Sequence, residues 1–256
     1  INKEQNMSKL VLVSGGGRGL GAAITESFVK SGYKVAINYC NSKEKAEELS
    51  IKLGDSVQAF KSDIRDEKQV SRMYEEINSH FNSYPDILVN NAMTNYIFNG
   101  DLRKNAENIS WNEIQNHLDV TIKGSLNLIQ ASTPKMKEQN FGRVINIGTN
   151  LVQNPVVPYH DYTIAKGGLL ALTRTFAKDL GQFGITVNMV SGGLLRITDA
   201  SAATPDEVFE AIAQMTPLQK VTTVEDLADA VVFFASDASR AITGQNQTVD
   251  GGLTFN

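Results

Sequence analysis

The sequence is short of cysteine, of histidine and of long apolar runs, and each shortage excludes a class of protein. Its one cysteine, Cys40, cannot form a disulfide within the chain, so we expect a protein of the reducing cytoplasm. Its three histidines, His80, His117 and His160, have no spacing typical of a metal site, and no metal is predicted. The longest apolar runs, such as Ala230 to Ala235, fall far short of the roughly 20 residues of a membrane-spanning helix.

The net charge and the chain length further limit the class of protein. The formal net charge is −4 and no basic patch is evident, which argues against nucleic acid as a partner. The start, Ile1 to Asn6, is polar and lacks the apolar core of a signal peptide, so we expect residues 1–8 to be a flexible leader. With 256 residues, 41% of them hydrophobic, the chain is predicted to be a single domain spanning 1–256.

Short apolar runs alternate with segments of helical spacing along the whole chain. The alternation predicts an α/β fold, a doubly wound Rossmann-type parallel sheet with helices on both faces. The expected strands are 10–14, 33–39, 57–61, 87–89, 143–147, 186–190 and 247–249. The expected helices are 20–31, 43–53, 67–81, 112–137 (one helix or two), 162–183 and 225–236.

Two long segments, Met93 to Ser110 and Ser191 to Thr204, fit no regular element. Each follows a predicted strand, where open α/β sheets bind their ligands, so both are candidates for a functional site. The overlapping stretch Leu194 to Met215, with a helix start near Pro205, is interpreted as a mobile substrate lid or as an ordinary helical excursion.

A glycine-rich turn joins the first predicted strand to the first helix. Its sequence is Ser-Gly-Gly-Gly-Arg-Gly-Leu-Gly over residues 14–21. Without side chains the backbone can approach a pyrophosphate closely, and the helix N-terminus offers it free N–H groups. Because a strand precedes the turn and a helix follows it, we predict dinucleotide binding rather than a plain turn.

The end of the second strand indicates which dinucleotide binds. A site for the unphosphorylated ribose usually offers a carboxylate about 20 residues after the turn. Here residues 38–42 read Asn-Tyr-Cys-Asn-Ser, and no acid follows until Glu44. Together with Arg18 inside the turn, this favours NADP (NADPH), whose 2′-phosphate a carboxylate would repel. A merely solvated Arg18 is the alternative.

Tyr162 and Lys166 are four residues apart at the start of a predicted helix, so they share one face. A free tyrosine has a pKa of about 10, and a nearby ammonium favours the phenolate and lowers that pKa. Such a pair can protonate a carbonyl oxygen as hydride reaches its carbon, or run the reverse. Because Tyr-x3-Lys spacing is common on any amphipathic helix, the pair indicates catalysis only together with a dinucleotide-binding turn.

These motifs, in this order, resemble the short-chain dehydrogenase/reductase family, most of all its bacterial beta-ketoacyl-acyl-carrier-protein reductases. The resemblance runs from Lys9 to Leu253. Besides the turn and the Tyr-x3-Lys pair, it includes Asp63-Ile64, Asn90-Asn91-Ala92, Val187-Asn188 with Gly192-Gly193, and the segments 242–245 and 249–252.

The resemblance implies roles for individual residues. Tyr162 is expected to be the acid or base, Lys166 to lower its pKa and hold the nicotinamide ribose, and Thr149 to bind the substrate carbonyl. Thr121 falls at the family's catalytic asparagine, which supports a proton relay. The expected cofactor contacts are Ser14, Gly15, Arg18, Gly19, Leu20, Gly21, Asn38, Tyr39, Ser42, Asp63, Ile64, Asn90, Ala92, Tyr162, Lys166, Gly193 and Leu195.

The chain departs from the family at several positions. Thr149 stands where serine is usual, Thr121 replaces the asparagine, Met93 a glycine and Gly192 a proline. Asn140 and Phe183 stand where the acyl-carrier reductases have arginines for their acidic partner, and this weakens acyl-carrier protein as a partner. A homo-oligomer, a tetramer, is expected by resemblance.

Three functions remain open. The leading hypothesis is an NADPH-dependent reductase of a carbonyl, with a beta-ketoacyl thioester as substrate. The alternatives are an alcohol or sugar dehydrogenase of the same family, and a cofactor-binding regulator without turnover. Other residues receive structural interpretations: Cys40 as a small buried residue, Trp111 as a packing anchor, and Asp206, Glu207 and Glu210 as a solvated helix face. Tyr159 and His160 are expected close to the substrate.

Overall fold

A computed structural model describes residues 9–196, 198, 201–202 and 204–255, so the expected leader 1–8 lies outside the described residues. Seven strands are present within these ranges: β1 (Leu10–Ser14), β2 (Lys34–Tyr39), β3 (Val57–Lys61), β4 (Ile87–Asn90), β5 (Gly142–Thr149), β6 (Ile185–Gly192) and β7 (Asn246–Val249). The α-helices are α2 (Gly19–Lys30), α3 (Lys43–Leu53), α4 (Glu67–Phe81), α5 (Trp111–Leu118), α6 (Ser125–Glu138), α7 (His160–Leu180), α8 (Asp206–Met215) and α9 (Val224–Ala235).

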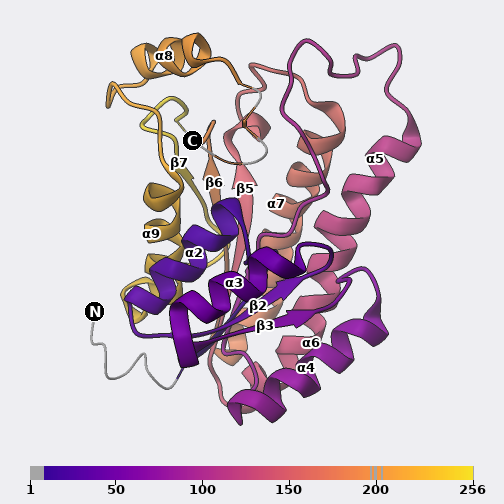
Figure 1. Cartoon of the computed structure of the whole chain (residues 1–256), viewed down its shortest axis with the longest axis vertical. Helices are drawn as coiled ribbons and strands as arrows, with labels where there is room; N and C mark the ends of the chain where they lie inside the picture. Colours follow the sequence, from indigo (N-terminus) through magenta and orange to yellow (C-terminus); the bar gives the residue numbers. More distant parts are fainter. Residues whose placement is uncertain (1–8, 197, 199–200, 203, 256) are drawn as a thin grey trace.

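The strands form one sheet in the order β3-β2-β1-β4-β5-β6-β7, and every described pair is parallel (Figure 1). This confirms the predicted doubly wound fold. β5 and β6 each extend two residues beyond the predicted strand at the carboxyl end, because their register continues through Thr149 and Gly192. Ser191 and Gly192 are therefore strand, not part of an irregular segment.

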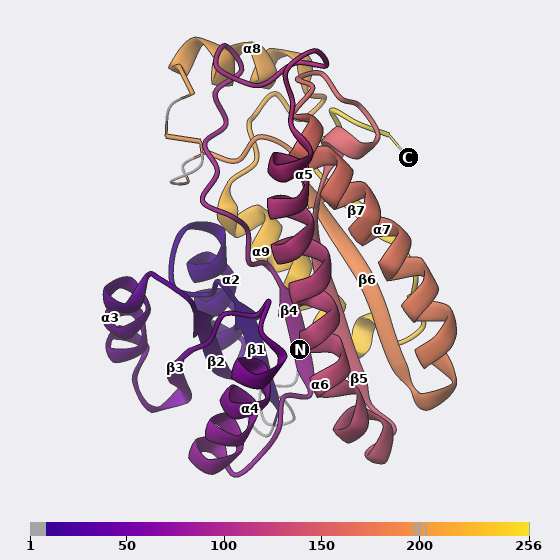
Figure 2. The same ribbon diagram turned by 90° about the vertical axis from the view of Figure 1, so that its right-hand side faces the viewer.

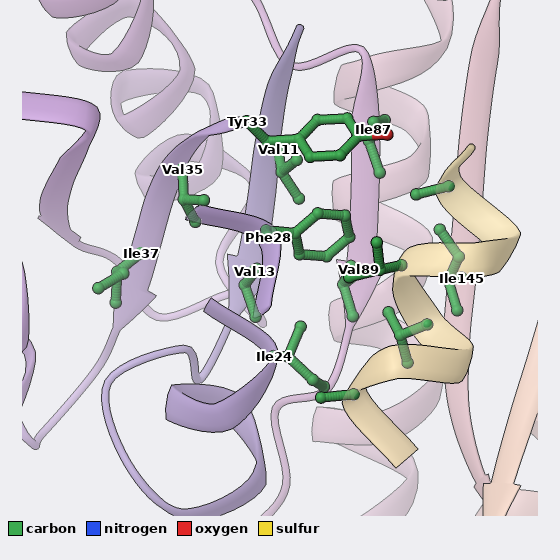
Figure 3. Close-up of a cluster of buried hydrophobic side chains, with 14 of the residues drawn as sticks. Val11, Val13, Ile24, Phe28, Tyr33, Val35, Ile37, Ile87, Val89 and Ile145 are labelled. Atoms are coloured by element: carbon green, nitrogen blue, oxygen red, sulfur yellow. The ribbon is translucent and has the colours of Figure 1, made fainter. Parts of the chain in front are cut away.

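The central strands of the sheet are buried on both faces, as expected for parallel strands covered by helices. Alternate residues of β1 point to opposite sides: Val11 and Val13 join the core under α2, α3 and α9, whereas Leu10 and Leu12 join the core under α4, α6 and α7. Figure 3 shows Phe28 of α2 packed over the first of these faces. Figure 2 shows the second helical layer along the other side of the sheet.

The segment expected as one helix or two is helical throughout but changes its winding. Between α5 and α6, residues Asp119–Gly124 form a π-helical turn that includes Thr121. Such turns are rare and frequently lie at functional sites. The Thr121 side chain is buried, so the position expected to support a proton relay lies inside the domain on an unusual turn.

Two interpretations of single residues are wrong. Trp111 is not a packing anchor: it is the first residue of α5, directly after the capping residue Ser110, and it is 67% exposed. Cys40 is not buried, because it lies one residue beyond β2, where the chain has left the sheet. The exposed face of α8, with Asp206, Glu207 and Glu210, is as predicted.

Parallel strands bring their carboxyl ends to one edge, and the described parts of the two long irregular segments begin there. The segment from Met93 to Ser110 follows β4, and the described residues among 193–205 stand in the sequence between β6 and α8. Figures 1 and 2 show the first of these segments and α8 at the same end of the molecule, beyond the strand tips. Within the described residues, no helix is both long and apolar enough to span a membrane.

Candidate active site

The glycine-rich turn is held open by bonds to the segment after β4. Asn91 donates from Nδ2 to the carbonyl oxygens of Ser14 (2.9 Å) and Gly15 (3.2 Å). Gly15 and Gly19 have φ of +63° and +51°, a conformation that favours glycine. The N-cap of α2, Arg18, makes no side-chain capping bond. The first N–H groups of α2 are thus not satisfied by a cap, as a phosphate site requires.

Absent side chains also keep the turn compact. A Cβ at Gly17 would lie 2.7 Å from Cβ of Ala46, and one at Gly21 would lie 2.1 Å from the carbonyl oxygen of Gly15. This is the cradle that a pyrophosphate needs, so the residues present fit a dinucleotide.

Several predicted cofactor residues use their side chains to brace the sheet. Ser14 Oγ accepts from the backbone N–H groups of Asn91 and Ala92, both at 3.0 Å. Asn38 donates to the carbonyl of Ser62 at 3.0 Å, and Asn90 donates to Asn146 at 2.8 Å. These buried side chains shape the edge of the site, so any direct contact of theirs with a cofactor would come from backbone atoms.

The end of β2 carries the groups that would face an adenosine ribose. Tyr39 is buried, Cys40 and Asn41 are exposed and Ser42 is half-buried. One carboxylate that acts on this region, Asp63, is held by both oxygens on Arg65, whose Nε lies at 2.9 and 3.2 Å and whose Nη2 lies at 2.6 Å. That hydrogen bonding lowers the pKa of Asp63, so its charge is persistent but compensated.

The remaining predicted cofactor positions lie around the same edge. Leu20 and Leu195 pack partly buried against the core under α2 and α9. Ile64 is buried and fills the space beside Gly124 of the π-helical turn. A Cβ at Gly193 would lie 3.0 Å from Cβ of Asp250. Their contacts with a cofactor stay predictions.

Thr149, Tyr162 and Lys166 meet at the carboxyl end of β5. Thr149 is the last residue of that strand, and its hydroxyl shares a hydrogen bond with the phenol of Tyr162. The ammonium of Lys166 lies 5.7 Å from the Tyr162 ring centroid and donates to the carbonyl of Ile147 at 2.6 Å. All three side chains are buried, so the structure brings these predicted residues together inside the domain.

The expected lowering of the Tyr162 pKa is not found in this structure. Burial raises the pKa of Tyr162 to about 12, and the hydrogen bond from Thr149 offsets only part of that effect. Burial also lowers the pKa of Lys166 to about 8. Desolvation is the largest cause of both shifts. The phenol is protonated at neutral pH, which is the form that can give a proton to a carbonyl oxygen.

An aromatic cover explains that burial. We use this term for Tyr96, Phe98 and Tyr159. The Tyr96 ring is stacked on the Tyr162 ring, with centroids 5.9 Å apart. The Phe98 ring meets the Tyr162 ring edge-on, with centroids 5.1 Å apart. Tyr159 packs on Phe98 at 5.3 Å. Tyr159 thus lies beside these rings, and its closeness to a substrate stays a prediction; the sequence did not point to Tyr96 or Phe98.

A buried polar pair beside the cover was also missed. His117 of α5 is 3% exposed, and its Nε2 lies 3.5 Å from Oδ2 of Asp161. The His117 side chain therefore belongs to the buried interior of the domain. A signal was available, because His117 stands one helical turn before Thr121, and Asp161 directly precedes Tyr162. His160 begins α7 and is half-buried.

The buried ammonium gives a prediction about stability. Replacing Lys166 by methionine is expected to stabilise the ligand-free protein at pH 7 by about 2 kcal/mol. A pKa lowered from 10.5 to about 8 corresponds to roughly 3 kcal/mol of desolvation cost, less about 1 kcal/mol for the lost hydrogen bond to Ile147.

The pH dependence follows from linkage. Because the folded pKa lies below the unfolded one, the cost is fully present below about pH 8 and disappears as the pH rises towards 10.5. Urea unfolding of both proteins at pH 7 and pH 9.5 measures this, and the advantage of Lys166→Met should shrink at the higher pH. A variant less stable than the parent at pH 7, or an advantage independent of pH, would contradict the assignment.

The chain is similar to known proteins over nearly its whole length. Residues 15–254 match the profile of a family described as Enoyl-(Acyl carrier protein) reductase. The chain is 37% identical over 253 residues to 3-oxoacyl-(acyl-carrier-protein) reductase FabG of Staphylococcus aureus, covering 96% of this chain and 98% of that protein. It is 31% identical over 245 residues to the Salmonella typhimurium protein of that name, covering 96% and 97%.

Among solved structures, a protein of Agrobacterium tumefaciens assigned as a gluconate dehydrogenase matches with a TM-score of 0.86. The match has 26% sequence identity and covers 97% of each chain. Both kinds of match extend from the glycine-rich turn to the last strand.

Proposed function

Because the chain belongs to the short-chain dehydrogenase/reductase family and is therefore an oxidoreductase, we propose that it uses NADPH to reduce the carbonyl of a beta-ketoacyl thioester to a hydroxyl. The observation that carries the proposal is the hydrogen-bonded pair of Thr149 and Tyr162 beside Lys166. Two hydroxyl groups and one ammonium converge there, at the sheet edge that also carries the glycine-rich turn.

The chain's own groups divide the work on the carbonyl. The protonated phenol of Tyr162 gives its proton to the carbonyl oxygen, and the Thr149 hydroxyl donates a hydrogen bond to that same oxygen. The ammonium of Lys166 stabilises the phenolate that remains. A bound nicotinamide cofactor supplies the hydride. The aromatic cover excludes water, which strengthens each of these electrostatic effects.

The proposed preference for NADPH is supported by the end of β2. No carboxylate stands on residues 38–42, and Asp63 is compensated by Arg65. A 2′-phosphate would therefore meet little repulsion there. Arg18 donates from Nη2 to Oδ1 of Asn95 at 3.1 Å, and contact of this half-buried side chain with the 2′-phosphate is part of the proposal.

The thioester substrate is supported by the curated relatives, which are named as reductases of 3-oxoacyl groups on acyl-carrier protein. The second candidate, an alcohol or sugar dehydrogenase, is favoured by Asn140 and Phe183 and by the gluconate dehydrogenase match. Both residues lie at the amino ends of β5 and β6, and Phe183 packs under the Lys137 ammonium at 4.2 Å. A homotetrameric assembly belongs to the proposal as well, whereas Asn140 and Phe183 weaken acyl-carrier protein as a docking partner.

The test is NADPH oxidation followed at 340 nm with acetoacetyl-CoA, a simple ketone and a keto form of a sugar acid, each repeated with NADH. We expect acetoacetyl-CoA to be reduced best and kcat/KM to favour NADPH by at least about 10-fold, the effect of one lost charge-assisted contact. Preference for the sugar acid would support the second candidate. Cofactor binding without turnover on any carbonyl would support a regulator, and equal kcat/KM with NADH would refute the cofactor assignment.

A further inference from the structure

Asp161 is the centre of a small polar network that joins three separate elements. Its Oδ1 accepts from the backbone N–H of Tyr162 at 2.9 Å and from the hydroxyl of Tyr96 at 3.1 Å. Its Oδ2 lies 3.5 Å from Nε2 of His117. One carboxylate thus ties α5, the first turn of α7 and the irregular segment after β4 to one another.

The network is placed where it acts on the catalytic tyrosine. Tyr96, bound through its hydroxyl to Asp161, lies parallel to the Tyr162 ring with an interplanar angle of 13°. The His117 ring contacts Tyr96 edge-on, with centroids 4.7 Å apart, and its centroid is 6.2 Å from that of Tyr162. Stacking alone is weak and allows sliding, whereas the hydrogen bond fixes where the Tyr96 ring lies.

Packing does not explain the network. His117 and Asp161 are 3% and 9% exposed, and apolar side chains of similar size would fill the same space without the cost of desolvating polar groups. Burial and the nearby Lys166 lower the pKa of His117, while Asp161 raises it. Tyr96 and Tyr162 are the other titratable groups against its ring, and Thr94 Oγ1 lies 3.3 Å from Nε2.

We infer that His117 and Asp161 are positioning residues, which hold Tyr96 against Tyr162 and so keep the aromatic cover closed over the phenol during turnover. The inference rests on the proposed function in one respect, that Tyr162 is the proton donor. Closure matters because the segment after β4 has no regular secondary structure to hold it in place. Without the network, water reaches the phenol and the proton transfer is less well aligned.

Four variants test the inference. Asp161→Asn removes the charge of the carboxylate, and His117→Phe removes the polar contact with Asp161. Both keep the size of the side chain nearly unchanged. Tyr96→Phe removes the hydroxyl but keeps the stacked ring. His117→Gln restores a donor near Asp161. The matched controls are Tyr84→Phe, which removes a remote tyrosine–carboxylate bond to Glu75 (3.1 and 3.2 Å), and His80→Phe, in a remote aromatic cluster with Phe60 and Phe81.

Two measurements are needed: steady-state kinetics with NADPH affinity, and amide hydrogen exchange over residues 93–110 in the ligand-free protein. For Asp161→Asn, His117→Phe and Tyr96→Phe we expect kcat to fall about 10-fold and exchange in that segment to rise about 10-fold, because a lid is loosened. The Kd for NADPH should stay within about 2-fold, and His117→Gln should recover most of the lost kcat. Both controls should match the parent.

Each contrary result has one meaning. Faster exchange with unchanged kcat would overturn the positioning role, and unchanged exchange would overturn the closure itself. Faster exchange over the whole chain, without recovery of kcat in His117→Gln, would show that His117 and Asp161 only stabilise the fold. If the parent protein reduces no carbonyl, the proposed function fails, and the exchange measurement still decides whether the network holds the cover.

Discussion

Replacing Tyr162 by phenylalanine is expected to lower kcat by about 100- to 10,000-fold, the range that a lost general acid usually costs. The phenol is the buried proton donor bonded to Thr149, and no other described hydroxyl shares a hydrogen bond with Thr149 at this site. The ring itself stays, and with it the contacts to Tyr96 and Phe98. The Kd for NADPH should therefore remain within about 2-fold of the parent value, because binding at the glycine-rich turn does not use the hydroxyl.

Stopped-flow or steady-state NADPH oxidation measures the rate, and fluorescence titration measures the affinity. Tyr84→Phe is the matched control, since it deletes one exposed tyrosine hydroxyl at the α4–β4 connection. A drop of less than about 10-fold in Tyr162→Phe would mean that another group supplies the proton.

Replacing Gly21 by alanine is expected to lower the free energy of unfolding by about 3 kcal/mol and to weaken NADPH binding at least about 100-fold. The new Cβ would lie 2.1 Å from the carbonyl oxygen of Gly15 and 2.8 Å from Nδ2 of Asn91. Neither neighbour can yield, because Asn91 is itself bonded to Ser14 and Gly15. The turn must open, and the N–H groups of α2 then lose their alignment with a phosphate.

Gly181→Ala is the control for this prediction. Gly181 lies beyond the end of α7 with φ −56° and ψ −34°, and a Cβ there would meet nothing within 4 Å. That variant should be neutral or more stable by up to about 1 kcal/mol. Urea unfolding and NADPH titration below the unfolding midpoint separate the two effects. Parent-like affinity in Gly21→Ala would show that the turn does not hold the cofactor.

The elements could be predicted because their local patterns agree with the final fold. The helices at 43–53 and 67–81 and the strand at 57–61 begin and end where the sequence indicated. The extensions of β5 and β6 could not be predicted, since Gly148 and Gly192 read as loop residues and only pairing across the ladder makes them strand. The exposure of Cys40 and Trp111 was predicted wrongly. Their residue types suggested burial, but both lie at the end of a secondary-structure element and are exposed.

The site could be predicted only in part. Thr149, Tyr162 and Lys166 follow from spacing along β5 and α7 and from the family resemblance. The aromatic cover depends on how an irregular segment folds back over α7, which no periodicity records. The raised pKa of Tyr162 depends on that same cover, so a rule based on the neighbouring ammonium alone gave the wrong direction for the ligand-free protein.

The π-helical turn at Asp119–Gly124 makes the length of its helix a functional quantity. One residue advances an α-helix by about 100° around its axis, so removing a residue from this turn would rotate α5 against α6 by that amount. α6 is fixed by Leu128 and Ile129 in the core, and the rotation would carry His117 away from Asp161. Insertions and deletions in this stretch are therefore expected to be tolerated less well than a substitution of its exposed residue, Lys123. The number of residues in this turn therefore sets the direction in which α5 presents His117 to the active site.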